Sequence, residues 1–347
     1  MSAASTTGAG AGAGAEPEPD RWPWDGAVVT DEAPLAKVLR YDHCLIATHD
    51  VAASVAFYDK LGFDEVTEEN ATATDEVTVL RNGAGFALHV VAADEGAADN
   101  VNLLMDDAGV KPPGHTHLAF KVPNVAAAKA YLESCGIEIS GERGVGGPEV
   151  RAVFCRDPSR TVNELERNFS PMVPMEEGAF TRAAIGCGRI DHVGTRVRDM
   201  EARFTWYARV LGLTRLVRRY DVNPDVLKNF TPWISRSEAD VDVNFIPNCN
   251  TNAAEGNVLT RGGALRPGIV YACLDVADVE ATKAAYTAAG VDFVDAAALA
   301  GAAGGGWELP PSKVKDLGRP SIFVKDPDGS YFRLAQEAVV APSKKHG

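Results

Sequence analysis

Two matching stretches decide the fold: YDHCLIATHDVAASVAFYDKLGF at residues 41–63 and IDHVGTRVRDMEARFTWYARVLGL at residues 190–213. Aligning His43 with His192 also superimposes an aspartate seven residues further on in both stretches. Each stretch reads as a strand, an aspartate that caps the start of a helix, the helix itself, and a Leu-Gly end. The chain is therefore expected to contain a long internal repeat.

A second pair of stretches repeats the pattern, HLAFKVPNVAAAKAYLESCGI at 117–137 and YACLDVADVEATKAAYTAAGV at 271–291. Short β-rich runs such as EVTVL, VRAVFC and SIFVK follow these units. The repeating unit is thus strand–helix–strand–strand–strand. Four such units fill the chain as two pairs, which predicts an α+β fold with two domains.

The domain boundaries follow from these repeats and from composition. Residues 1–25 are rich in Gly, Ala, Pro and Glu and lack the apolar core of a signal peptide, which predicts a disordered tail. We expect an N-terminal domain over 36–168, a linker over 169–187 and a C-terminal domain over 188–340.

The composition limits the classes of function. The net charge is −14, which argues against nucleic-acid binding and against docking to an anionic membrane. No apolar run is long enough for a membrane span. The six cysteines form no CxxC pair, and free buried thiols favour a cytoplasmic protein. A small molecule is the expected partner, and the sequence leaves a homo-oligomer open.

Strand alternation separates polar side chains from the core. Leu118 and Phe120 share the face that would pack on a helix, and His117 lies on the opposite face. By the same alternation His89 and Glu164 also project away from the helices. All three side chains can bind a metal, so we expect the face away from the helices to hold the functional groups.

With this architecture the chain resembles the vicinal oxygen chelate superfamily, which includes glyoxalase I, extradiol dioxygenases, epimerases and bleomycin-resistance proteins. The resemblance covers about Val38 to Glu337. It rests on the βαβββ units, on the Asp-His pairs at 42–43 and 191–192, and on the motifs RDPSRTVNEL and KDPDGSYFRL. The superfamily folds two units into a half-barrel around a metal.

The resemblance implies a ligand set in the N-terminal domain. The family's ligand positions hold His43, His117 and Glu164, which is a two-histidine, one-carboxylate set. Such a triad suits non-heme Fe(II), or Mn(II). His89 stands where glyoxalase I and epimerases carry a fourth ligand. In a dioxygenase it would be a catalytic acid or base, and the alternatives of ligand, acid/base and structural residue stay open.

The C-terminal domain departs from the family pattern. Tyr271 and Arg333 stand where His117 and Glu164 do, and an arginine cannot bind a cation. We therefore expect one metal site, with His192 in a supporting role. In addition, Phe154 replaces a tyrosine that extradiol enzymes usually carry ten residues before the metal glutamate.

The leading hypothesis is a metal-dependent dioxygenase whose substrate, a catechol- or hydroquinone-like compound, chelates Fe(II) beside O2. The first alternative is a redox-neutral lyase or isomerase of the glyoxalase or epimerase type, with Zn(II), Ni(II) or Co(II). The second alternative is a non-enzymatic binding or resistance protein.

Overall fold

The computed structural model describes residues 27–28, 32–67, 76–101, 111–144, 150–167, 180–186, 188–219, 233–236, 244–248, 264–301 and 307–338. The four strand–helix–strand–strand–strand repeats are present, so the predicted α+β architecture is confirmed. The predicted tail, residues 1–25, lies outside the described residues. The short strand β1 (Ala27–Val28) follows it. No helix among these residues is long and apolar enough to cross a membrane.

The first two repeats follow one another along the chain. Repeat 1 comprises β2 (Val38–Thr48), α1 (Val51–Lys60), β3 (Phe63–Glu65), β4 (Val77–Asn82) and β5 (Ala87–Ala92). Repeat 2 comprises β6 (Gly114–Lys121), α3 (Val125–Ser134), β7 (Ile139–Gly144), β8 (Val150–Arg156) and β9 (Val162–Glu166).

The other two repeats follow the short helix α4 (Arg182–Gly186). Repeat 3 comprises β10 (Ile190–Arg196), α5 (Met200–Leu211), β11 (Arg215–Arg219), β12 (Trp233–Arg236) and β13 (Asn244–Asn248). Repeat 4 comprises β14 (Gly268–Val276), α6 (Val279–Ala289), β15 (Phe293–Asp295), the 3₁₀ turns η2 (Ala296–Gly301) and η3 (Pro311–Lys313), β16 (Ser321–Lys325) and β17 (Tyr331–Gln336).

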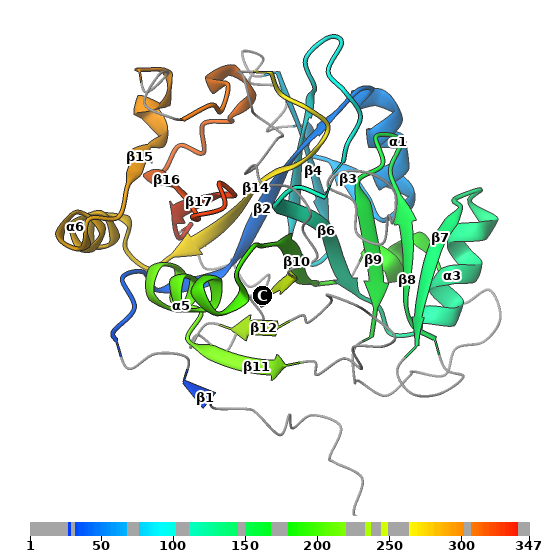
Figure 1. Cartoon of the computed structure of the whole chain (residues 1–347). Coiled ribbons are helices and arrows are strands. Elements are labelled where there is room, and N and C mark those ends of the chain that lie inside the picture. Colours follow the sequence, from blue (N-terminus) through cyan, green and yellow to red (C-terminus); the bar gives the residue numbers. More distant parts are fainter. Residues whose placement is uncertain are drawn as a thin grey trace, which may run out of the picture.

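The repeats pair across the predicted domains rather than within them. Repeats 1 and 4 form one eight-stranded sheet, in which β2 and β14 run antiparallel side by side (Figure 1). Repeats 2 and 3 form a nine-stranded sheet through the antiparallel pair β6 and β10. Each functional cluster therefore draws side chains from both halves of the chain.

The helices α1, α3, α5 and α6 each begin after an Asx residue whose side chain caps the helix, as the sequence predicts for α1 and α5. The side chains of Asp50, Asn124, Asp199 and Asp278 each accept a hydrogen bond from the backbone N–H three residues on, at 2.9–3.0 Å. The helix α5 ends at Gly212, whose φ of 74° is the left-handed conformation that favours glycine.

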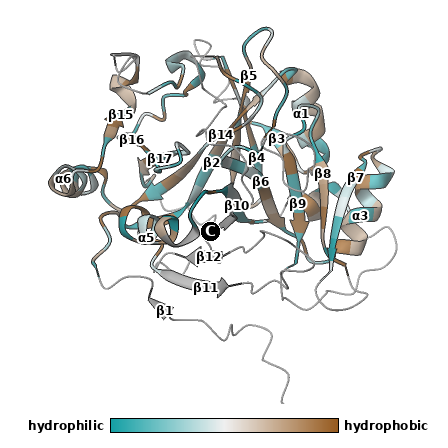
Figure 2. Ribbon diagram, viewed as in Figure 1, coloured by the Kyte–Doolittle hydropathy of each residue, from teal (hydrophilic) through white to brown (hydrophobic). Residues whose placement is uncertain are grey.

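The main core lies between the helices and the sheets. Leu118 and Phe120 of β6 are buried in it, as the alternation predicts, together with residues of all four repeats. Figure 2 shows hydrophobic residues along β8 and β14, in the interior of the two sheets. Phe180 and Ile185, in the described part of the predicted linker, are also buried against this core.

Two equivalent buried contacts hold the repeats together. The Tyr58 hydroxyl of α1 donates to Asp157 Oδ2 at 3.2 Å, and the Tyr207 hydroxyl of α5 donates to Asp326 Oδ2 at 3.3 Å. In both loops the other carboxylate oxygen, Oδ1, accepts two backbone N–H groups. Burial raises the pKa of both carboxyl groups to about 6.

Candidate metal centre

The sheet of repeats 2 and 3 gathers three metal-capable side chains. Nε2 of His117 lies 2.9 Å from Nε2 of His192, and Glu164 Oε2 lies 3.3 Å from the first and 3.5 Å from the second. Donor atoms of all three residues lie within 4.8 Å of one another. The side chains are at most 3% exposed, so the cluster is closed to bulk water.

The strands explain this meeting. His117 starts the parallel pairing of β6 with β9, and Ala119, two residues on, is in register with Glu164. On the other side of β6, His117 is opposite Gly194 in the antiparallel pairing with β10. A Cβ atom at Gly194 would overlap the His117 ring, so this position accepts only glycine while the ring stays in place.

The Nδ1 atom of each imidazole has a side-chain partner that orients the ring. Asp191 Oδ2 lies 2.8 Å from Nδ1 of His192, and the Thr116 hydroxyl lies 3.0 Å from Nδ1 of His117. In both rings Nδ1 therefore contacts a neighbouring side chain, and Nε2 faces Glu164. This is the arrangement in which histidine ligands are held in metalloproteins.

Buried charges dominate the electrostatics of the cluster. Burial alone would raise the pKa of Glu164, but the nearby Arg143 and hydrogen bonds from His117 and His192 hold it well below its usual range. Burial lowers the pKa of His117. Hydrogen bonds to Asp191, Glu164 and Glu166 outweigh burial at His192 and raise its pKa well above the usual range. The cluster thus holds a positive charge between carboxylates.

Glu166 and Arg143 complete the surroundings. Burial and the charges of Asp191 and Glu164 raise the pKa of Glu166 to about 8. The Arg143 guanidinium donates to Glu164 Oε1 at 2.8 Å and to Glu166 Oε2 at 3.0 Å. Its side chain is 31% exposed, so it is the cluster's link to the surface.

The structure does not bring His43 and His89 to this cluster. Both lie in the other sheet, where their rings stack with centroids 3.7 Å apart. His43 Nε2 is 3.2 Å from the Tyr271 hydroxyl, and Nδ1 of His89 has no hydrogen-bond partner among the described residues. The physical reason is the sheet pairing: β2 joins β14, while β6 joins β10. Of the predicted ligands, His117 and Glu164 therefore lie together beside His192, and His43 lies in the other sheet.

The second cluster has a different chemistry. Asp42, His43 and Cys273 also bring donor atoms within 4.8 Å. Asp42, however, is already bound to His43 Nδ1 at 2.6 Å and to Arg319 at 2.7 Å. Burial raises the pKa of the Cys273 thiol, which disfavours the thiolate that a metal needs. These contacts favour the first cluster as the metal centre.

Comparison with known proteins places the chain in a family. Residues 40–165 and 189–334 match the profile of the Glyoxalase/Bleomycin resistance protein/Dioxygenase superfamily. The chain belongs to this superfamily. Each matched segment holds two of the four repeats, so the superfamily's paired units account for nearly all of the described structure.

Proteins of similar sequence or structure include a lactoylglutathione lyase, a glyoxalase I and a protein provisionally named a dioxygenase. Lactoylglutathione lyase of Schizosaccharomyces pombe is 24% identical over 228 residues, which are 65% of this chain and 67% of the relative. Glyoxalase I of Zea mays matches 86% of this chain and 92% of its own at a TM-score of 0.53 and 20% identity. The provisionally named Bacillus subtilis dioxygenase matches 87% of this chain and 86% of its own at 0.52 and 14% identity. The two structural likenesses show a shared fold.

His192 was the residue whose place in the cluster the sequence analysis missed. A signal for it was present two residues further on, where Gly194 interrupts an otherwise bulky strand. The equivalent residue after His43 is Leu45, which leaves no such space. A glycine inside a strand marks close approach of another group, and here that group is the ring of His117.

Proposed function

We propose that His117, Glu164 and His192 bind one divalent metal ion. The support is the donor set itself, since two imidazoles and one carboxylate converge in a buried cluster. The neighbouring carboxylates raise the pKa of His192, and this raised pKa keeps a proton on the ring. A metal ion would replace that proton, so the cluster would keep a positive charge between its carboxylates.

The substrate would be a small molecule that offers two adjacent oxygen atoms. Two neutral imidazoles and one carboxylate leave a net charge of +1 on a divalent ion, which favours an anionic bidentate substrate. Arg143 would add a positive charge on the exposed side of Glu164 and help to orient such a substrate.

The reaction that the ligand set supports best is that of a non-heme iron dioxygenase. Three protein ligands leave room for a bidentate substrate and for O2, which is typical of the two-histidine, one-carboxylate triad. A bound Fe(II) ion would supply Lewis acidity and a template for both reactants. Glu166, whose Oε1 lies 3.5 Å from Nδ1 of His192, would be a carboxyl group beside the centre that can accept or release a proton.

A glyoxalase-type lyase with Zn(II), Ni(II) or Co(II) is the second candidate. The similarity to lactoylglutathione lyase favours it. The position in repeat 3 that is equivalent to Glu164 argues against it. Glu164 is in register with Ala119, two residues after His117. Ile246 is in register with Gly194, two residues after His192. An isoleucine cannot supply the fourth ligand of the glyoxalase set.

The metal content of the full chain, purified without oxygen and measured by elemental mass spectrometry, tests the centre. His192→Ala and His43→Ala make a matched pair, because both residues follow an aspartate at the start of a repeat. We expect about one metal per chain in the wild type and in His43→Ala, and a loss in His192→Ala. Loss only in His43→Ala would restore the ligand set expected from the sequence.

The metal's identity and oxygen uptake then separate the reactions. Iron together with substrate-dependent O2 consumption on catechols supports the dioxygenase. Zinc, nickel or cobalt with turnover that needs no O2 supports the lyase. A chain that binds no metal even after reconstitution would contradict both and leave a binding protein.

A further inference from the structure

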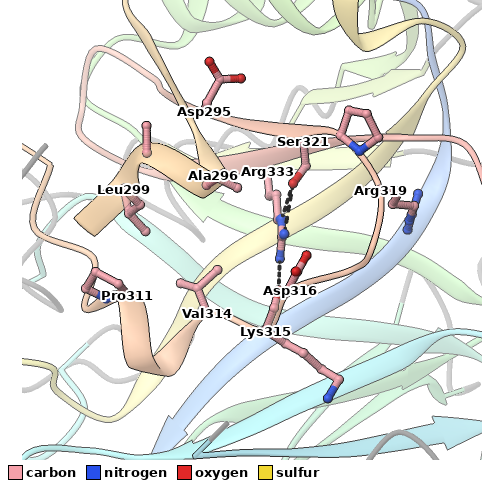
Figure 3. Close-up of a pocket in the computed structure, with 13 residues that line it drawn as sticks. Asp295, Ala296, Leu299, Pro311, Val314, Lys315, Asp316, Arg319, Ser321 and Arg333 are labelled. Carbon is pink, nitrogen blue, oxygen red and sulfur yellow. Dashed lines mark hydrogen bonds between the residues drawn. The ribbon is translucent and has the colours of Figure 1, made fainter. Parts of the chain in front are cut away.

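Repeat 4 contains a cavity of about 560 Å³ that is separate from the metal centre. It lies between η2, η3 and the start of β16, and Figure 3 shows Arg333 at its centre. Apolar side chains such as Leu299 and Val314 line one part of it. Its volume is within the range of small-molecule sites, roughly 300–1,000 Å³.

The Arg333 guanidinium is a buried charge without a counter-ion. The residue is 1% exposed. Its Nε and one terminal nitrogen donate to Ser321 Oγ at 3.1 and 2.9 Å, and the other donates to the Lys315 carbonyl at 2.8 Å. These partners are neutral, and no carboxylate of the described residues forms an ion pair with it. A buried charge left in this state destabilises a protein unless a ligand pairs with it.

The other charged groups at the cavity do not supply that counter-ion. Arg319 is bound to Asp42 at 2.7 Å and to Asp275 at 2.5 Å. Asp295 pairs with Lys283 at 2.9 Å, and the exposed Asp316 accepts the backbone N–H of Gly318. The buried Lys315 also lines the cavity, and its side chain is directed away from Arg333 (Figure 3).

Arg333 occupies the strand position in repeat 4 that is equivalent to the position of Glu164 in repeat 2. Arg333 is in register with Cys273 in the parallel pair of β14 and β17, as Glu164 is with Ala119 in β6 and β9. The repeat thus carries a cation where repeat 2 carries the carboxylate of the metal cluster. The same scaffold position therefore favours a ligand of the opposite charge.

We propose that this cavity is a second binding site, and that it binds a small organic acid through Arg333. The head group would be a carboxylate or a phosphate monoester, whose oxygens accept paired N–H bonds from a guanidinium. A short apolar body would lie against Leu299 and Val314. This site is independent of the metal centre and of the reaction proposed there.

The test compares anions with a neutral analogue of the same shape. Butyrate, butyl phosphate and butyramide are titrated into the full-length protein at constant ionic strength, by calorimetry and by thermal unfolding. Saturable binding of at least one anion, with an increase in Tm and no effect of butyramide, supports the proposal. The tighter of the two anions identifies the head group. No anion binding to the wild type overturns the proposal.

Three variants locate the binding. Arg333→Met should weaken it by about tenfold or more, since a charge-assisted hydrogen bond is lost. Ala297→Trp fills the cavity from an exposed lining position and should block binding with Arg333 intact. It keeps the test valid if Arg333→Met does not fold. His192→Ala should bind the anion as the wild type does. Binding that survives both cavity variants, or that disappears in His192→Ala, overturns the assignment.

Discussion

Gly194 gives the ring of His117 its place. The two residues face each other across β10 and β6, and a side chain at position 194 would occupy the space of the imidazole. The proposed metal centre therefore depends on a residue that contributes no ligand atom. It also depends on the pairing of repeat 2 with repeat 3, because Gly194 and His117 come from different repeats.

Gly194→Ala is expected to displace His117 and abolish metal binding, at a stability cost of about 1–3 kcal/mol for overpacking. Gly136→Ala is the matched control. Its φ of 72° strains an alanine by about 1–2 kcal/mol, with no neighbour within 4 Å of the new Cβ atom. Both variants should unfold earlier in denaturant, and only the first should lack metal. Equal metal content in the two would show that the ring can move aside without loss of the site.

Arg143→Gln is expected to tighten divalent metal binding several-fold. The guanidinium holds Glu164 Oε1 at 2.8 Å and competes with an incoming cation for that carboxylate. Calorimetric titration of the metal-free protein with Zn(II) measures the change. The metal-free variant should also be less stable than the wild type, because Glu164 and Glu166 lose a partner. Weaker zinc binding in the variant would mean that Arg143 instead orients the carboxylate.

Metal removal should lower the stability of the wild type. An ion at a hundredfold excess over its Kd stabilises the native state by about 2.7 kcal/mol. Treatment with a chelator should therefore reduce Tm in the wild type and leave Tm of His192→Ala unchanged. A chelator effect of equal size in both proteins would place the metal elsewhere.

The contribution of two buried carboxyl groups to the free energy of unfolding should fall as the pH rises from about 4 to 7. Asp157 and Asp326 have pKa values of about 6 in the folded chain, against an ordinary value of 3.8 for aspartate. The folded state thus binds more protons than the unfolded state in this window, so this contribution is complete below pH 4 and is lost above pH 6.

Asp157→Asn and Asp326→Asn remove this titration while the amide oxygen can still accept the two backbone N–H groups. In each variant the slope of the unfolding free energy against pH should become more positive than that of the wild type, by at most about 3 kcal/mol summed over the window. Denaturant unfolding at several pH values measures this slope. A slope equal to that of the wild type would show that the carboxyl groups titrate as they do in the unfolded chain.

Local sequence predicted the repeats well because their signals are local. The caps at Asp50 and Asp199 mark helix starts, and alternation in the strand from His117 separates the core from the polar face. Even the meeting of His117 with Glu164 was predictable, since both belong to repeat 2 and their strands pair within it.

The place of His192 in the cluster depends on which repeat pairs with repeat 2, and local sequence does not encode this long-range pairing. His43 and His192 both follow an aspartate and begin equivalent strands, so either could lie opposite His117. The choice depends on which repeat packs beside repeat 2, and that is decided by the summed packing of whole repeats. The space at Gly194 is the one feature of a single residue that distinguishes the two.

The exchange of repeats between the sheets has a consequence for how the chain is made. Repeats 2 and 3 are adjacent in sequence, so the pairing that gathers His117, Glu164 and His192 can form while the C-terminal end is still on the ribosome. The sheet of β2 and β14 has to wait, because its central pair joins the first repeat to the last. Until repeat 4 emerges, β2 is an open edge that invites pairing with another chain. Slow synthesis would therefore prolong the exposure of β2 and favour misassembly of the sheet that holds the Arg333 cavity. The sheet that holds the proposed metal centre could already have formed by then.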